Sequence, residues 1–211
     1  MHIKQSVQGN EDSLVSRSQH GDIYAFNQLI DHYQLVMYSV VYRIIGNTEI
    51  AADVTQDAFL SAFRNIRSYR GKASFRAWLL RIGSNMACDH WRRVQRHPVD
   101  SLDHILEEGE AGIGASLVQD QEAEGNPEQH LMARELQELL QRALQHLPLD
   151  QRTAVALCDI EGLSYEEIAT ITQTTIGTVR SRISRGRARL RDYLSHYREL
   201  LPRDYRLTGS E

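Results

Sequence analysis

Apolar residues recur at helical spacing along nearly the whole chain. Between positions 26 and 41 they fall three and four residues apart, and the same spacing returns between 59 and 66. No stretch shows the convincing alternation of apolar and polar residues that marks a half-buried strand. Proline occurs only at positions 98, 127, 148 and 202, so it does not interrupt the periodic segments. The sequence therefore predicts an all-α protein.

An acidic segment divides this helical pattern into two parts. From His97 to Glu128 there are nine acidic residues, four glycines and no Lys or Arg. Such a composition is typical of a flexible linker. We therefore expect two small helical domains joined by this linker. The predicted order is a flexible N-terminus (1–11), an N-terminal domain (12–95), the acidic linker (96–128), a C-terminal domain (129–197) and a C-terminal tail (198–211).

The formal net charge of -4 conceals two basic segments. Arg64 to Arg93 holds eight basic residues and one acidic residue, and Gly177 to Arg191 holds six arginines and no acidic residue. A basic surface is what a nucleic-acid-binding protein needs to offset phosphate charge. The charge pattern therefore indicates two candidate DNA-binding surfaces.

The C-terminal domain carries the start signals of two helices. Ser164 is followed three residues later by Glu167, the capping-box pattern that marks a helix start. A short polar turn follows, and a second helix is expected from about Ile176 with Thr175 as its cap. This spacing is that of a helix-turn-helix.

The second helix has an apolar stripe and an opposed arginine-rich face. The apolar stripe is formed by Val179, Ile183, Gly186 and Leu190. An arginine-rich face can be a solvated surface, but none of these arginines has an acidic residue four positions on before Asp192. A guanidinium fork can hold phosphate or read guanine. We therefore interpret this helix as a recognition helix for the major groove.

Three stretches of this domain carry a family resemblance. They are Leu147-Pro148 with Arg152, Gly162 to Ala169, and Gly177 to Ile183 followed by Arg185. Together they resemble region 4, the −35-binding domain of bacterial extracytoplasmic-function (ECF) sigma factors, group 4 of the sigma-70 family. The resemblance implies that Arg180, Ser181 and Ser184 face −35 bases, and that Arg182 and Arg185 suit backbone phosphates. Thr178 completes the implied −35 set.

A second resemblance lies in the N-terminal domain. Asp53 to Phe59 resembles the family's helix that docks on the clamp of RNA polymerase. Asp53, Gln56 and Asp57 stand at i, i+3 and i+4 and so share one helical face. Taken alone, this face could be a solvated acidic surface. The resemblance implies that it binds core polymerase.

The segment from Phe63 to Arg93 resembles the family's region 2, which recognises and melts the −10 element. It interleaves cations with aromatic rings, a combination that holds single-stranded DNA through phosphates and stacked bases. Some of the rings, Phe75 and Trp78 among them, also have the helical spacing of core residues, whereas Asn85 suits a captured base edge. The predicted −10 set is Tyr69, Arg70, Lys72, Ser74, Phe75, Arg76, Trp78, Arg81 and Asn85.

The resemblance implies an RNA polymerase sigma factor that directs the enzyme to −35 and −10 elements and helps melt the −10 region. Its implied partners are core RNA polymerase, through the β and β′ subunits, promoter DNA and an anti-sigma factor. We expect no catalytic residue, metal or cofactor. The longest apolar stretch, Leu35 to Ile45, has 11 residues, which is too short for a bilayer core of about 30 Å. With no secretory signal in Met1 to Gln8, a cytoplasmic protein without membrane insertion is expected.

Two other classes of protein are open to the same sequence. A conventional helix-turn-helix regulator with an unrelated N-terminal sensor would bind duplex DNA without polymerase, but explains neither the Asp53 to Asp57 motif nor the first basic segment. An enzyme could use Cys88 with His90, or a histidine-based metal site. However, residues two apart on a helix point away from each other, and the nine histidines lack ligand spacing.

Overall fold

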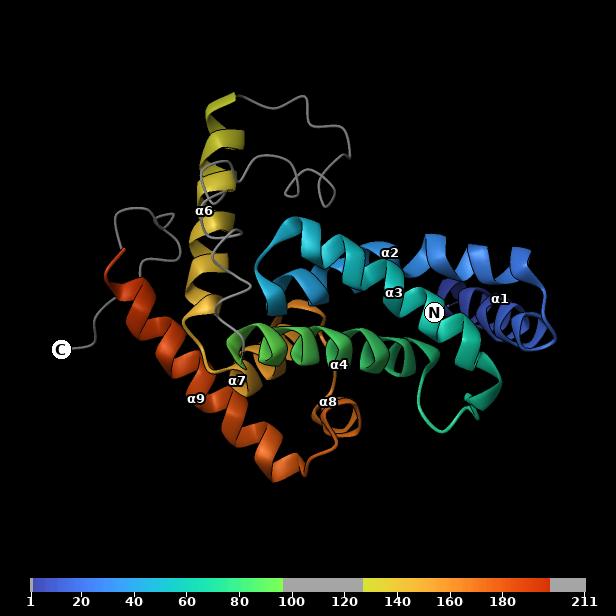
Figure 1. Cartoon of the computed structure of the whole chain (residues 1–211). Coiled ribbons are helices and arrows are strands. Elements are labelled where there is room, and N and C mark those ends of the chain that lie inside the picture. Colours follow the sequence, from blue (N-terminus) through green and yellow to red (C-terminus); the bar gives the residue numbers. More distant parts are fainter. Residues whose placement is uncertain (1, 97–126, 198–211) are drawn as a thin grey trace.

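The computed structural model describes residues 2–96 and 127–197, and within these ranges all regular structure is helical (Figure 1). The all-α prediction is confirmed. The N-terminal domain comprises α1 (His2–Gln19), α2 (Ile23–Ile45), α3 (Thr48–Asn65), the 3-10 turn η1 (Ile66–Ser68) and α4 (Phe75–Arg96). The C-terminal domain comprises α6 (Pro127–Gln145), α7 (Leu149–Val155), the π-helical turn η4 (Ala156–Ile160), α8 (Tyr165–Thr172) and α9 (Ile176–Ser195).

Two of the predicted segments fall largely or wholly outside the described residues. Positions 97–126 of the predicted acidic linker (96–128) lie outside the described residues. The whole of the predicted C-terminal tail (198–211) lies outside them as well. The N-terminus (1–11) was also predicted to be irregular. In the structure its residues 2–11 are helical and belong to α1. Helix α1 packs on α2 and η1 and thereby becomes part of the N-terminal domain.

Two polar side chains and a glycine set the start and end of α2 and the start of α3. The Asp22 carboxylate accepts a hydrogen bond of 3.0 Å from the Ala25 amide and begins α2. Gly46 ends α2 in the left-handed region, at φ 92°, where glycine has no steric penalty. The Asn47 side chain then accepts from the Ile50 amide at 2.9 Å and begins α3. A Gly-Asn pair therefore turns the chain back, so that α2 and α3 pack side by side.

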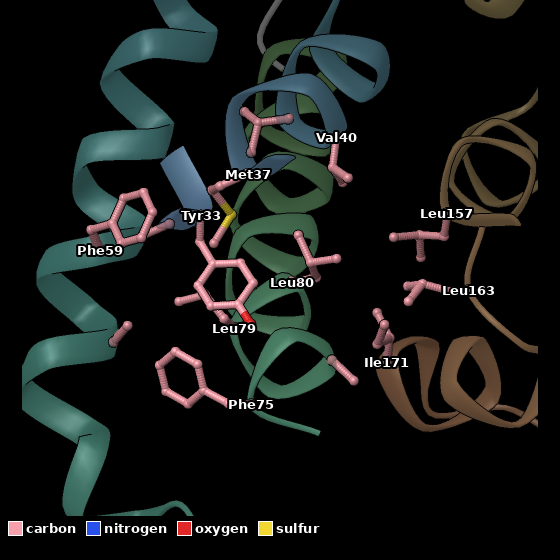
Figure 2. Packing of buried hydrophobic residues seen from close by; sticks show 14 of the residues in the cluster. Tyr33, Met37, Val40, Phe59, Phe75, Leu79, Leu80, Leu157, Leu163 and Ile171 are labelled. Carbon is pink, nitrogen blue, oxygen red and sulfur yellow. The ribbon is translucent and has the colours of Figure 1, made fainter. Parts of the chain in front are cut away.

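The two domains pack directly on each other. Helix α8 lies against α4, and α7 lies against α2. Buried apolar residues of both domains form one continuous cluster, in which Leu157, Leu163 and Ile171 face Val40 and Leu80 (Figure 2). The two predicted helical domains therefore share a core. No helix within 2–96 or 127–197 is long and apolar enough to cross a membrane.

Candidate nucleic-acid interface

Both predicted helix caps of the helix-turn-helix are present. The Glu167 amide donates to the Ser164 hydroxyl at 3.2 Å, and the Ser164 amide donates to the Glu167 carboxylate at 2.9 Å. The Thr178 amide donates to the Thr175 hydroxyl at 3.2 Å and begins α9. The capping-box prediction and the Thr175 prediction are therefore confirmed.

Three of the four residues of the predicted apolar stripe of α9 are buried and Leu190 is half-buried, and this stripe orients the helix. Val179, Ile183 and Gly186 are buried, and α9 packs on α7. A Cβ atom on Gly186 would lie 2.7 Å from Cγ2 of Val155, so the close approach of the two helices requires glycine there. The opposite, arginine-rich face of α9 is consequently turned to solvent.

The arginines of α9 fall into two groups. Arg182 pairs with Asp150 at 3.0 Å, and Arg187 donates to Asp159 at 3.0 Å. The hydrogen bonds that the Arg187 guanidinium donates to the Asp159 carboxylate raise the pKa of Arg187. Arg180 and Arg185 are exposed, and within the described residues neither forms an ion pair. These two arginines are therefore the predicted −35 residues whose guanidinium groups are available to DNA.

The remaining predicted −35 residues line the first turns of α9. Ser184 is exposed. Thr178 and Ser181 are half-buried, and the Ser181 hydroxyl donates to the Thr178 carbonyl at 2.9 Å. Of the six predicted residues, Arg182 is the one whose charged group is already paired, because Asp150 lies across from it at the start of α7.

Most of the predicted −10 residues surround one hollow of about 650 Å³ between the η1–α4 loop and α4. Its lining includes six of the nine, namely Tyr69, Arg70, Lys72, Trp78, Arg81 and Asn85. Asn85 is exposed on α4. Burial raises the pKa of Tyr69, so its phenol stays protonated at neutral pH. The hollow thus combines cations, ring faces and a polar side chain able to read a base edge.

The three other predicted −10 residues do not line this hollow. Phe75 is only 2% exposed and packs against Tyr69 and Trp78, with ring centroids 5.5 and 5.6 Å away. Its predicted DNA contact is therefore corrected to a supporting role beneath two rings that line the hollow (Figure 2 shows Phe75 in the core). Ser74 and Arg76 instead contact the C-terminal domain.

Helix α1 holds the loop that forms the hollow, a role that the sequence does not reveal. Gln19 donates to the main-chain carbonyls of Ile66 and Tyr69, at 3.2 and 2.8 Å. The Tyr69 hydroxyl in turn donates to the Ala73 carbonyl at 2.9 Å. A second hollow of about 670 Å³ separates α1 from the other side of this loop. Hydrogen bonds from Gln19 and Tyr69 therefore fix the loop, and one of the two hollows lies on each side of it.

The predicted polymerase-binding residues Asp53, Gln56 and Asp57 are all exposed on α3. The buried side of the same helix is formed by Val54, Thr55 and Ala58, among others. These observations agree with the helical face expected from the i, i+3, i+4 spacing.

An apolar groove adjoins this face, and no prediction from the sequence included it. The groove has a volume of about 630 Å³, lies between α2 and α3 and includes Gln56 in its lining. Three large apolar side chains at its edge, Ile23, Leu35 and Leu60, are 58%, 52% and 47% exposed. Within residues 2–96 and 127–197, the Thr55 hydroxyl, also in the lining, is buried without a hydrogen-bond partner. The signal in the sequence was that 35–45 is apolar almost throughout, more than one buried helix face requires.

The candidate enzyme residues do not form a reactive pair. Burial raises the pKa of Cys88, which keeps its thiol protonated at neutral pH. The Cys88 sulfur contacts the Thr153 hydroxyl at 3.4 Å, while His90 contacts Arg93. Within the described part of the chain, no three His, Cys, Asp or Glu residues are grouped to hold a metal.

Comparisons with known proteins agree with both predicted regions. Residues 29–97 match the family model described as Sigma-70 region 2, and residues 137–190 match the model described as Sigma-70, region 4. A conventional regulator with an unrelated N-terminal sensor would not match region 2. The fold resembles CnrH in its complex with the cytosolic domain of CnrY, with a TM-score of 0.62 and 22% identity, covering 89% of this chain and 98% of that chain.

Closer similarity in sequence decides the family. The sigma factor RpoE in complex with the anti-sigma factor NepR from Bartonella quintana is 25% identical with a TM-score of 0.58, covering 82% of this chain and 98% of that one. The ECF RNA polymerase sigma-E factor of Escherichia coli (strain K12) is 38% identical over 182 residues, 86% of this chain and 93% of that protein. The RNA polymerase sigma-H factor of Pseudomonas aeruginosa is 39% identical over 181 residues, with 86% and 92% covered. The chain belongs to the ECF RNA polymerase sigma factors of the sigma-70 family.

Proposed function

We propose that this sigma factor uses three separate surfaces: the exposed face of α3 for core RNA polymerase, the hollow at the η1–α4 loop for the melted −10 strand, and the free arginines of α9 for the −35 element. The observation that carries the proposal is the convergence of six predicted −10 residues on one hollow. Cations there can follow phosphates while rings stack on exposed bases. The polymerase performs the chemistry, and this chain acts as a non-catalytic initiation factor in the cytoplasm.

The polymerase surface combines a charged edge with an apolar groove. Asp53, Gln56 and Asp57 form the charged and polar edge, and Leu35 and Leu60 expose apolar surface beside it. An interface of this kind gains affinity from the apolar part and orientation from the charged part. We assign the groove to core polymerase. We also propose that an anti-sigma factor is a further partner of the chain.

Replacing Asp53 and Gln56 together with alanine is expected to weaken core binding by about 10-fold, because rim contacts of this type contribute modestly and add together. Binding to labelled core polymerase measures the affinity, and run-off transcription on a promoter library measures the consequence. Asp192→Ala removes an exposed acidic residue from α9 instead and should leave core binding unchanged.

The groove can be tested apart from the charged edge. Leu60→Gln keeps the charge and removes apolar contact, so it should also weaken core binding. Unchanged core affinity in the Asp53→Ala, Gln56→Ala protein would contradict the assignment of α3. If the unmodified chain supported no polymerase-dependent, promoter-selective initiation, the proposed function itself would be wrong.

Arg180→Ala is expected to relax −35 selectivity by about 10-fold at one base pair, the effect of losing one bidentate base contact. Run-off transcription from promoters that differ at single −35 positions measures this change. Arg187→Ala is the matched control, because Arg187 lies on the same helix as Arg180 and is held in an ion pair by Asp159 of η4. Equal effects of the two substitutions would point to general loss of positive charge and against base reading by Arg180.

A further inference from the structure

Helix α9 is longer than the DNA groove that it is proposed to enter is wide. It has 20 residues and is therefore about 30 Å long, whereas the major groove of B-DNA is about 12 Å wide. All six predicted −35 residues lie between Thr178 and Arg185, in the first half of the helix. A recognition helix contacts base edges with the residues near its N-terminus. The second half of α9, from Gly186 onward, therefore extends beyond the base pairs that the first half reads.

Packing determines which side of this second half faces solvent. Leu190 packs against Leu144 of α6 and Val155 of α7. About one turn later, the ring centroid of Tyr193 lies 4.5 Å from that of His146. Helices α6 and α7 lie along one side of α9 (Figure 1). The opposite side of the second half of α9 is therefore the side that faces solvent.

Arg191 lies on this solvent side. It follows Arg180 by 11 residues, which make about three turns of helix, so the two arginines share one stripe of α9 and lie about 16 Å apart along its axis. Ser184 lies on the same stripe between them. Arg191 is exposed, and within residues 2–96 and 127–197 it forms no ion pair. The stripe that carries predicted base contacts in its first half thus carries a free guanidinium group in its second half.

The other charged residues near Arg191 do not replace it. Arg187 lies on the same stripe, but it donates to the Asp159 carboxylate at 3.0 Å, so its charge is already paired within the C-terminal domain. Asp192 is exposed and follows Arg191 directly. Consecutive residues of a helix are rotated by about 100°, so the Asp192 carboxylate projects from a different side. Of the two arginines on the stripe beyond Ser184, Arg191 is therefore the one available to an anion.

We propose that Arg191 anchors α9 to a phosphate of the DNA backbone at the edge of the groove, outside the base pairs that Arg180 reads. This inference rests on the proposed −35 function of α9. With the first half of the helix in the groove, the second half passes the sugar-phosphate strand that borders it, and a guanidinium group binds phosphate through its charge and its hydrogen bonds. A phosphate contact fixes position but reads no base. Arg191 is therefore a positioning residue that strengthens −35 binding without changing its sequence preference.

Arg191→Gln keeps a polar side chain and removes the charge. In the holoenzyme assembled with core polymerase, this variant should bind a promoter fragment, selected in the run-off assay, about 5-fold more weakly at about 0.15 M salt. The slope of log affinity against log salt concentration should become shallower by about 1, because one fewer counterion is released on binding. Promoters that differ at single −35 positions should all lose affinity by the same factor. Arg191→Lys keeps the charge and should retain both the affinity and the salt slope.

Arg189→Gln is the matched control. Arg189 is also exposed, and in the part of the chain that the structure describes it forms no ion pair. Residues two apart do not share a side of a helix, so this variant removes the same charge from another side of α9. Its affinity for the promoter should change by less than about 2-fold, because salt screens a charge that touches no phosphate. Equal losses in Arg189→Gln and Arg191→Gln would show a general effect of positive charge and would refute the anchor.

The remaining outcomes separate this inference from the proposed −35 function. If Arg191→Gln binds promoters like the unmodified protein while Arg180→Ala still relaxes −35 selectivity, the anchor is wrong and the −35 function stands. The anchor is also wrong if Arg191→Gln alters the preference among −35 bases, which would make Arg191 a base-reading residue, or if it weakens binding to core polymerase alone. If substitutions in the −35 element do not change promoter binding by the unmodified holoenzyme, the proposed function of α9 fails and the inference fails with it.

Discussion

Replacing Arg152 with alanine is expected to lower the free energy of unfolding by about 3–5 kcal/mol, the usual cost of removing one member of a buried charged network. Arg152 is only 2% exposed. Its guanidinium donates to the main-chain carbonyls of Ile44, Leu144, Gln145 and Leu147, at 2.6 to 3.1 Å. Alanine would leave the carbonyls of Ile44, Gln145 and Leu147 without this donor, at about 1–3 kcal/mol for each one that water does not reach, whereas the Leu144 carbonyl still accepts from the Leu147 amide.

The charge of Arg152 is balanced by carbonyl dipoles and not by a carboxylate. No acidic partner for it is present within the described ranges, and its guanidinium lies 5.6 Å from the ring centre of Trp91. Burial lowers the pKa of Arg152 to about 10, so it remains charged at neutral pH. Arg152→Lys should also be destabilising, because one ammonium group cannot reach four separated carbonyls.

Urea unfolding followed by circular dichroism measures this effect. Arg187→Ala removes an arginine whose side chain is 48% exposed and ion-paired with Asp159, and it should cost less than about 1 kcal/mol. A midpoint in Arg152→Ala equal to that of Arg187→Ala would show that these carbonyls find water, and would refute the role given to Arg152.

The sequence predicted those parts of the fold that depend on neighbouring residues. The capping pair Ser164 and Glu167, the Thr175 cap and the buried stripe of α9 act within a few residues, and each was predicted from spacing alone. The bonds from Gln141, Gln145 and Arg152 to the end of α2 join positions about a hundred residues apart. Nothing in local spacing specifies such partners, so the packing of the two domains could not be predicted.

The same distinction explains the outcome for the site. Tyr69, Trp78 and Asn85 share one hollow because two short adjacent segments carry them, and this grouping could be predicted. The pairing of Arg182 with Asp150 and of Arg76 with Glu161 arises between separate helices, so these cations looked free in the sequence. The sequence allowed two roles for Phe75, a core residue by its helical spacing and a −10 contact by its place in the segment that resembles region 2. Its burial in the structure shows that it is a core residue.

Replacing both Tyr69 and Asn85 with alanine is expected to slow promoter opening on the order of 100-fold. A lost base stack contributes about 1–3 kcal/mol, and a lost hydrogen bond to the base edge adds about 1 kcal/mol. Each single variant should show about a 10-fold effect by the same reasoning. Fluorescence of 2-aminopurine placed in the −10 element reports opening, and binding to core polymerase should be unchanged because α3 is untouched.

The contribution of the ring can be separated from that of the loop it supports. Tyr69→Phe keeps the ring and removes the hydroxyl that donates to Ala73, so opening close to that of the unmodified protein would assign the effect to stacking. A promoter already unpaired at the −10 element removes the cost of melting, and on it the double variant should recover in part. Full recovery would mean that these side chains only melt the duplex. No recovery, together with Tyr69→Phe as impaired as Tyr69→Ala, would mean that Tyr69 shapes the loop and that the strand is captured elsewhere.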